Sequence, residues 1–472
     1  MQTAARIQPN TEVDNAYKKT VGQICQVVEG MPLAIELAAS WLNVLSVEEI
    51  LQELSAGIEL LEASTRDVPE RHKSIRAVFE YSWRLLSASQ QRSLTALSVF
   101  IGNFDREAAQ HVTATLTRGL LELMSKSLIR RQSTGRFDLH PLIQQYAYAK
   151  LAETHQRLKD MLAKHSAYYL EFLSLQGDAL QRGEHKVAMD AVELNLNNCQ
   201  QAWQWAVEAQ QFDNIIASSH ILETYYSQRN KVQEGVAFFE QMVAQLDMSD
   251  ASQQVPVGVI LASQGWLQLR MGRHQLAEQI SLKALELLRP HAYYRGIMKT
   301  LNTLGVIYDR QGEYDQARAC LEEAIDLAVT QNKPRLKASY MQNLAGIEAS
   351  LGRLNEAESL YVEALANSKQ LKNHVHVISI LNNLGIVYQK QHKYEKSNAL
   401  YEEGLALAKD MNLQKSIAYI LSNMALNYAF LNQFDEARKY DEQALVLAQA
   451  DQNNFLEASI LKHLAELDIK QT

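Results

Sequence analysis

The chain has 472 residues, of which 47% are hydrophobic and only seven are proline, a composition that favours packed helices arranged in two or three domains. Its net charge of −8 gives no general attraction to nucleic acid or to an anionic membrane. The three cysteines, Cys25, Cys199 and Cys320, are too far apart in sequence to indicate a disulfide framework or a metal site. No cleavable signal and no run of about 18 apolar residues is present, so we expect a cytoplasmic protein without membrane or metal.

Residues 12–29 have apolar side chains at helical spacing and predict the first helix. Gly30 can end this helix, and Pro32 suits the first turn of the next one. The segment GMPLAIELAASWL, residues 30–42, resembles the GLPL motif in the helical module that follows the nucleotide-binding domain of NB-ARC-type signalling ATPases, members of the STAND class. In that family the proline lies against the adenine base, so the resemblance implies a nucleotide contact at Pro32. The alternative is a proline that only starts a helix.

Residues 71–151 predict three helices and a β-hairpin. Two amphipathic helices meet at Ser87, whose spacing to Gln90 is that of a capping box. A third helix is expected at about residues 117–127, and two short strands flank a glycine turn within residues 128–140. Three helices followed by a hairpin are typical of a winged helix.

This segment resembles the winged-helix module of the same STAND family. The sequence LHPLIQQYA, residues 139–147, falls where that family has a histidine that contacts the β-phosphate of ADP and keeps the switch closed. His140 is the matching residue, although Pro141 replaces the aspartate that follows it in plant relatives. The alternative is that His140 caps the hairpin or packs beneath it.

An internal repeat dominates the second half of the chain. Segments that start at Leu261, Leu301, Met341, Leu381, Leu421 and Leu461 align without a gap, so the period is forty residues (301 − 261 = 40). A fixed period of this length indicates a solenoid. The fifth position of each unit is small, which lets a neighbouring helix come close: Gly265, Gly305, Ala345, Gly385, Ala425 and Ala465.

Two apolar stripes in each unit predict two antiparallel helices. LNTLGVIYDRQGEYDQARACLEEAIDLA, residues 301–328, resembles a tetratricopeptide repeat with long linkers. The predicted fold is therefore all-α: a helical module and a winged helix, followed by a right-handed tetratricopeptide-repeat solenoid. The expected domains are residues 1–70 (helical module), 71–151 (winged helix), 152–220 (helical junction) and 221–472 (solenoid with a degenerate first repeat).

The chain contains no phosphate-binding loop. Such a loop needs G-x-x-x-x-G-K-[ST], and no Lys-Ser or Lys-Thr pair in this sequence, such as Lys126-Ser127, is preceded by glycine. The resemblance therefore begins after the ATPase core and implies the C-terminal portion of a longer switch protein. We expect no ATP hydrolysis and no cofactor in this chain, with ADP or ATP bound only together with the missing core.

The repeats supply the predicted binding site. Stacked helix pairs leave a groove lined by the first helix of each unit. Asparagines at the third position could bond the main chain of a ligand through donor and acceptor alike: Asn343, Asn383 and Asn423. One or two turns further along the first helices of the repeats, a basic rim is expected: Arg270, Arg310 and Lys390, with Gln389. The alternative is that all of these residues are simply solvated.

The sequence favours a non-catalytic sensor of a STAND-type signalling protein, in which a protein, a peptide or a small inducer binds the groove and biases a nucleotide switch. One alternative is a stand-alone interaction scaffold. Another is a transcription regulator that contacts DNA phosphates through Arg130, Arg131 and Arg136 on the wing, although the acidic net charge favours a solvated hairpin. The ligand, the output and the oligomeric state stay open.

Overall fold

The computed structural model describes residues 15–28, 30–64, 78–181 and 184–471, and nearly all of their regular structure is helical. The chain divides into two compact units, Met1–Ala179 with His185–Ser218 and Leu180–Glu184 with Ser219–Thr472. The all-α prediction is confirmed, and a two-stranded hairpin is the only sheet in the described residues. None of the helices in those ranges combines the length and hydrophobicity needed to cross a membrane.

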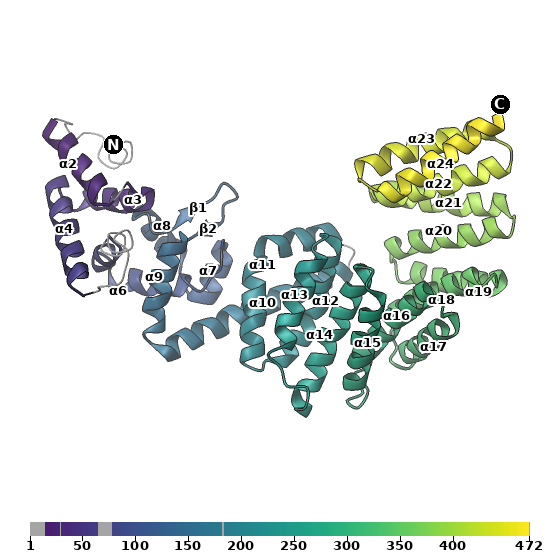
Figure 1. Ribbon diagram of the computed structural model, residues 1–472, viewed down its shortest axis with the longest axis horizontal. Coiled ribbons are helices and arrows are strands. Elements are labelled where there is room, and N and C mark those ends of the chain that lie inside the picture. Colours follow the sequence, from purple (N-terminus) through teal and green to yellow (C-terminus); the bar gives the residue numbers. More distant parts are fainter. Residues whose placement is uncertain (1–14, 29, 65–77, 182–183, 472) are drawn as a thin grey trace. The chain divides into compact units, whose positions relative to one another are not determined.

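The first unit opens with four short elements: α2 (Asn15–Val27), α3 (Pro32–Ser40), η1 (Trp41–Asn43) and α4 (Val47–Ser64) (Figure 1). The predicted first helix is confirmed over Asn15–Val27, and residues 12–14 and 29 of the predicted range lie outside the described residues. Helix α3 starts at Pro32, because a proline at this position has no N–H to leave unpaired. Helices α2 and α4 pack together and bury Ile24, Ile50 and Leu54.

The next segment holds a helical stretch at residues 78–84 and these elements: α6 (Ala88–Leu97), α7 (Arg106–Thr113), α8 (Thr117–Ser125), β1 (Arg130–Arg131) and β2 (Phe137–Asp138). The predicted capping box is confirmed, since Ser87 and Gln90 exchange hydrogen bonds at the start of α6. The expectation of two helices before residue 117 is wrong, because Asp105 starts a further helix. Its carboxylate accepts a hydrogen bond from the Ala108 N–H at 2.7 Å.

The predicted hairpin is also confirmed. Strands β1 and β2 pair antiparallel, with Arg131 opposite Phe137, and Gly135 makes the turn at a φ of 82° that favours glycine. Phe137 also forms an isolated antiparallel bridge with Phe104. The hairpin is therefore tied to the segment that precedes α7.

Four more helices follow: α9 (Pro141–Ala152), α10 (His155–Gln181), α11 (His185–Glu208) and α12 (Phe212–Gln228). Within the first unit, Phe100 stacks on Phe104 with ring centroids 4.4 Å apart, and Tyr169 of α10 meets Phe100 edge-on. Helix α12 begins at Phe212, before the residue at which the degenerate first repeat was expected to start. The boundary between the two units falls inside this helix.

The second unit is a stack of helix pairs (Figure 1). Its helices are α13 (Val232–Val243), α14 (Ala251–Arg270), α15 (His274–Leu288), α16 (Tyr294–Gln311), α17 (Tyr314–Thr330), α18 (Pro334–Ser350), α19 (Leu354–Gln370), α20 (His374–Lys390), α21 (Tyr394–Asp410), α22 (Gln414–Phe430), α23 (Phe434–Ala450) and α24 (Asn454–Gln471). From α14 onward, each helix packs mainly against its neighbours in sequence. The solenoid prediction is therefore confirmed.

The corners between these helices recur every twenty residues (292 − 272 = 20). Each corner contains a residue with left-handed backbone: Gly272, Ala292, Gly312, Asn332, Gly352, Lys372, His392, Asn412, Asn432 and Gln452. A left-handed residue ends a helix and lets the N–H groups that follow form hydrogen bonds with the last carbonyls of that helix. At one such corner Gly312 N–H donates to Asp309 O at 3.1 Å. The forty-residue sequence period thus consists of two backbone halves of equal length.

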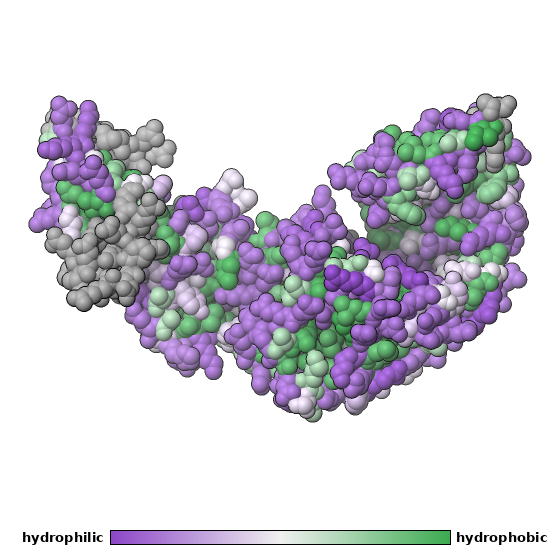
Figure 2. All heavy atoms as spheres, viewed as in Figure 1, coloured by the Kyte–Doolittle hydropathy of each residue, from purple (hydrophilic) through white to green (hydrophobic). Residues whose placement is uncertain are grey.

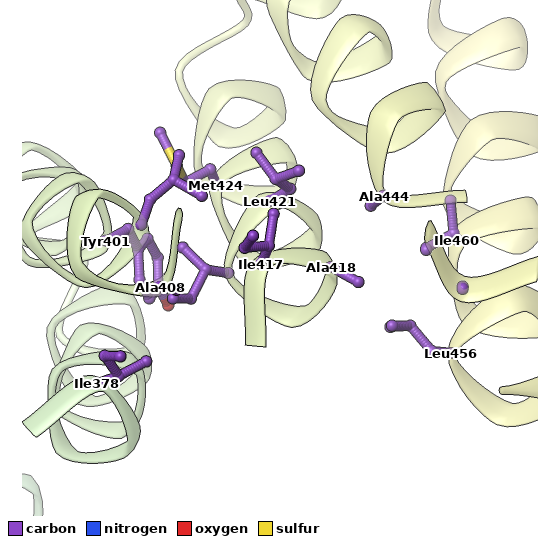
Figure 3. Packing of buried hydrophobic residues seen from close by; sticks show 13 residues of the cluster. Ile378, Tyr401, Ala408, Ile417, Ala418, Leu421, Met424, Ala444, Leu456 and Ile460 are labelled. Carbon is purple, nitrogen blue, oxygen red and sulfur yellow. The ribbon is translucent and has the colours of Figure 1, made fainter. Parts of the chain in front are cut away.

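The small fifth position of each repeat allows its two helices to approach closely. A Cβ atom at Gly385 would lie 2.3 Å from the Tyr401 ring, so the glycine makes room for this fully buried tyrosine. Figure 3 shows Tyr401 with Ile417 and Met424 gathered in the core around α21 and α22. The glycine and alanine signature of the sequence therefore reflects close packing of α20 on α21 and of its equivalents.

Candidate functional site

A row of asparagines runs along the first helices of successive repeats. Its members are half-buried and are together called the amide ladder: Asn302, Asn343, Asn382, Asn383 and Asn423. Leu344 and Leu384 follow two of them directly and are buried, so the ladder lies along the border between the core and the surface. Figure 2 shows mostly hydrophilic atoms over α16–α24 in this view, with hydrophobic atoms in smaller groups.

The amide ladder is hydrogen bonded from one repeat to the next. Asn343 Nδ2 donates to Asn302 Oδ1 at 2.7 Å, and Asn423 Nδ2 donates to Asn382 Oδ1 at 2.9 Å. Both pairs span 41 residues (343 − 302 = 41), so the third position of one repeat bonds the second position of the preceding one. Asn382 Nδ2 also donates to Asn383 Oδ1 at 3.3 Å. Neighbouring repeats thereby hold the asparagine side chains in place.

Two ladder residues, Asn302 and Asn382, were not predicted as site residues. The sequence signal that could have identified them is the 41-residue spacing between asparagines of adjacent repeats, which becomes meaningful only once the helices are stacked. Among the described residues, no donor reaches the Oδ1 atoms of Asn343 and Asn423. An amide has two donors and an acceptor oxygen, so these side chains retain capacity for a ligand.

The structure places three residues of the predicted basic rim at helix ends and the fourth, Gln389, against a buried asparagine. Arg270, Arg310 and Lys390 each lie exposed in the last turn of their helix, where a positive charge interacts favourably with the helix dipole. Lys390 Nζ also donates to the Ala349 carbonyl at 3.3 Å, near the end of α18. Gln389 turns inward, and its Nε2 donates to Asn427 Oδ1 at 2.7 Å, within the buried polar contacts of α22.

A second polar cluster lies on α12, α14 and α16 of the second unit. Lys299 Nζ forms an ion pair with Glu223 and donates to Ser263 Oγ at 2.8 Å. The Glu223 side chain is only 6% exposed, and a buried carboxylate is strongly destabilising without such a partner. Arg295, one turn before Lys299, lies near Tyr340, whose pKa is raised by burial and partly lowered again by that guanidinium. The cluster places two cations near the start of the amide ladder.

In the first unit, the predicted nucleotide-contact residues lie at the start of α3 and at the start of α9. His140 caps α9, its Nδ1 accepting the Leu142 N–H at 3.3 Å. The pKa of His140 is lowered by burial and by Arg130, while Glu36 opposes this shift. Glu36 lies one turn after Pro32 in α3, and the Pro32 side chain is exposed. Pro32 therefore shares a helix with a carboxylate that acts on His140.

Arg136 was expected on the surface of the wing, and this expectation is wrong. The residue is only 9% exposed, and its guanidinium donates to Asp105 Oδ2 at 3.2 Å and to Asn195 Oδ1 at 2.7 Å. A guanidinium can serve several acceptors at once, so Arg136 joins the hairpin to α11. Arg130 and Arg131 remain exposed on β1.

No grouping of histidine, cysteine, aspartate and glutamate suited to a metal ion occurs in the described ranges. A tetratricopeptide-repeat family model matches residues 260–328 and 337–410, and a second tetratricopeptide-repeat model matches residues 417–450. These matches run from α14 to the end of α23.

Two relatives from Mycobacterium tuberculosis have similar sequences. One, named "Putative HTH-type transcriptional regulator", is 27% identical over 250 residues, which cover 51% of this chain and 28% of the relative. The other, named as uncharacterized, is 33% identical over 163 residues, which cover 32% of this chain and 41% of the relative. The chain thus spans less than half the length of either relative.

Among solved structures, a STAND protein with a tetratricopeptide-repeat sensor from Pyrococcus horikoshii aligns over 93% of this chain and 69% of that protein, with 15% identity and a TM-score of 0.49. The repeat models, the forty-residue period and the stacked helix pairs agree with one another. Between residues 260 and 450, this chain is an array of tetratricopeptide repeats.

Proposed function

We propose that this chain is the non-catalytic sensor and regulatory part of a STAND-type signalling protein, and that its amide ladder binds an extended segment of a protein or peptide. The observation that carries this proposal is the set of hydrogen-bonded asparagine pairs, Asn302 with Asn343 and Asn382 with Asn423. These pairs fix the side chains and leave the outer acceptors unoccupied by described residues.

The chemistry of asparagine suits an extended main chain. Such a chain presents N–H and C=O groups along its length, and an amide side chain can bond either kind of group whatever the ligand's sequence. Because Asn302, Asn343, Asn382 and Asn423 are already held by a neighbouring repeat, less conformational entropy is lost on binding than with free side chains. The ladder extends over α16, α18, α20 and α22, a length that suits an extended segment better than a compact inducer.

Charged residues indicate which ligands would bind best. Lys299 and Arg295 lie near the start of the ladder, and Lys390 lies near the end of α20. Charge-assisted hydrogen bonds are stronger than neutral ones, so acidic side chains on the bound segment would add affinity. The partner we propose is therefore an extended segment with acidic residues.

The route from the ladder to the rest of a signalling protein is part of the same proposal. Arg136 ties the hairpin to α11, which leads into α12, the helix shared by both units. We propose that ligand binding on the solenoid changes the packing of the winged-helix-like segment. Pro32 and His140 would contact ADP or ATP only alongside a nucleotide-binding domain supplied by a longer protein.

The binding proposal can be tested by selecting peptides from a displayed random library on the immobilised wild-type chain. Replacement of both Asn343 and Asn423 by alanine removes the two inter-repeat bonds, so the selected peptides should bind at least about tenfold more weakly, which corresponds to about 1.4 kcal/mol. Asn355→Ala, on the exposed face of α19, is the matched control and should bind as wild type does. Equal affinity of the double variant and the control would overturn the proposal.

A second candidate function is DNA binding, because one relative is named as a transcriptional regulator. Arg130 and Arg131 are exposed on the hairpin and could contact phosphates. This candidate predicts duplex binding that weakens steeply with salt and weakens further in Arg130→Ala and Arg131→Ala. Absence of salt-dependent binding in electrophoretic mobility assays would eliminate it.

A further inference from the structure

The repeat pattern changes at one place near the end of the solenoid. His463 on α24 occupies the third position of its unit, where the three preceding repeats have asparagine. Asp441 on α23 occupies the twenty-first position, where Tyr361 and Tyr401 stand in earlier repeats. The two positions are neighbours in the fold, because Asn383 lies close enough to Tyr361 to influence its pKa across the same 22-residue interval (383 − 361 = 22). An acid and an imidazole therefore replace a phenol and an amide.

The pair has an unusual environment. Asp441 Oδ2 lies 2.5 Å from His463 Nδ1, and the two side chains are 0% and 12% exposed respectively. The other carboxyl oxygen of Asp441, Oδ1, is buried without a hydrogen-bond partner. No described residue bonds His463 Nε2, the ring nitrogen that remains once Nδ1 is engaged. The pair thus holds the ring at one nitrogen and leaves the other available.

Burial of the pair determines whether the available nitrogen carries a hydrogen. Burial raises the pKa of Asp441, and His463 opposes this shift. A buried pair is most stable without net charge. In the neutral pair, the shared proton sits either on Nδ1 or on Oδ2, and Nε2 carries a hydrogen in both arrangements. Nε2 would become a bare acceptor only if the buried pair held a net negative charge.

We propose that His463, held by Asp441, is a carboxylate-binding donor at the α24 end of the amide ladder. This inference rests on the proposed function, because it names the chemistry that a bound segment presents to α24, the first helix of the last repeat. An asparagine would serve a main-chain carbonyl equally well, whereas the Nε2–H of a ring that shares a proton with Asp441 is partly positive and favours an anionic acceptor. The carboxylate can come from an acidic side chain or from a chain terminus.

A purely structural pair would behave differently. It would dock α24 onto α23 and would need no available nitrogen. In an earlier repeat, two neutral residues, Tyr361 and Asn383, stand at the same two positions. The distinguishing readout is therefore the response of Nε2 to ligands, rather than stability alone. Asp441 acts here as a positioning residue for His463.

Nitrogen-15 NMR of the histidine-labelled full chain measures that response. We expect His463 Nε2 to carry hydrogen, as it does in both arrangements of the neutral pair. The Nε2 signal should shift on titration with acetyl-Gly-Asp-Gly-amide and with acetyl-Gly-Gly-Gly bearing a free carboxylate. The uncharged acetyl-Gly-Asn-Gly-amide should bind about tenfold more weakly, since charge-assisted bonds are about twice as strong as neutral ones. A response to only one of the two carboxylates would identify the source that the site accepts.

The variant His463→Asn restores the residue type of the earlier repeats and retains a donor toward Asp441. It should bind the aspartate and asparagine peptides equally, while His374→Asn, at the exposed start of α20, should keep the wild-type preference. A bare Nε2 in the wild-type chain, or an undiminished preference in His463→Asn, would refute the inference. The first readout needs no variant, so a poorly folded variant does not prevent the test.

The two proposals fail separately. Loss of library-peptide binding in the ladder variant with no carboxylate response at His463 would support the ladder and refute the carboxylate site. A carboxylate response at His463 with no peptide bound by the ladder would leave the site as a local anion-binding feature of the last repeat.

Discussion

His165 shows how one buried residue makes stability depend on pH. Its side chain on α10 is almost fully buried, its Nε2 lies 3.1 Å from Asn198 Oδ1, and its ring meets Phe100 edge-on. Burial lowers the pKa of His165 from 6.5 to about 4, and the hydrogen bond to Asn198 only partly opposes this shift. The native state therefore holds a neutral imidazole over a pH range in which the unfolded chain binds a proton.

This difference predicts that the free energy of unfolding falls as the pH is lowered from about 6.5 to about 4, because the unfolded state binds more protons. Between pH 7 and pH 5 the His165 contribution should be about 2 kcal/mol, at about 1.4 kcal/mol for each pH unit below 6.5. Urea unfolding followed by tryptophan fluorescence measures it, since Trp41, Trp83, Trp203 and Trp205 belong to the first unit and only Trp266 to the second.

The informative comparison is between His165→Gln and wild type. The variant removes the titrating group, so its loss of stability between pH 7 and pH 5 should be smaller by that amount. His155→Gln, at the exposed start of the same helix, should behave as wild type does. An unchanged pH dependence in His165→Gln would mean that other groups determine it.

At the scale of elements, the helix corners use the same backbone conformation with different residues. Gly352 and Lys372 both have a positive φ, 76° and 52°, but only the glycine adopts it without a steric penalty. Lys372→Gly should therefore raise the free energy of unfolding by about 1 kcal/mol, and Gly352→Ala should lower it by about the same amount.

Thermal unfolding of the two variants tests the corner prediction. The control is Lys369→Gly inside α19, which should be destabilising because glycine is unfavourable within a helix. If Lys372→Gly proved as destabilising as Lys369→Gly, the left-handed corner would not carry the expected strain.

The same elements show which parts of the fold the sequence predicts. The capping box at Ser87, the turn at Gly135 and the small residue at Gly385 follow from local rules, and each is confirmed. The helix that starts at Asp105 was missed because Asp105 is a single cap signal within a stretch read as one helix.

The site was less accessible to sequence reasoning, because its contacts connect different repeats. The third-position asparagines were visible in the period, whereas the pairing of Asn343 with Asn302 depends on the offset between stacked helices. The sequence position of Gln389 is compatible with either the buried or the exposed side of its helix. Only its hydrogen bond to the buried Asn427 shows that the side chain turns inward. The nucleotide roles of Pro32 and His140 stay predictions.

At the scale of the whole molecule, the second unit behaves as a one-dimensional array, because each repeat contacts mainly its neighbours. Helix α24 differs from the helices inside the array. Its Leu461 is exposed, whereas Leu421 is buried at the equivalent position of α22, and Phe455 and Ile469 are 80% and 74% exposed.

Amide hydrogen exchange of this 472-residue chain should therefore be faster in α24 than in α20 and α22. Mass spectrometry of peptides from the three helices measures the difference, and the matched comparison is the equivalent third turn of each helix. Equal protection would show that α24 is stabilised by contacts beyond those of one neighbouring helix.

The twenty-residue recurrence of the helix corners has a consequence for how such a chain can evolve. Because every corner has the same geometry and helices α17–α23 all have 17 residues, duplication or deletion of one forty-residue segment recreates the same joints on both sides. The solenoid can thus lengthen or shorten by whole repeats without a new core, and the proposed binding surface would change its length in a single recombination event.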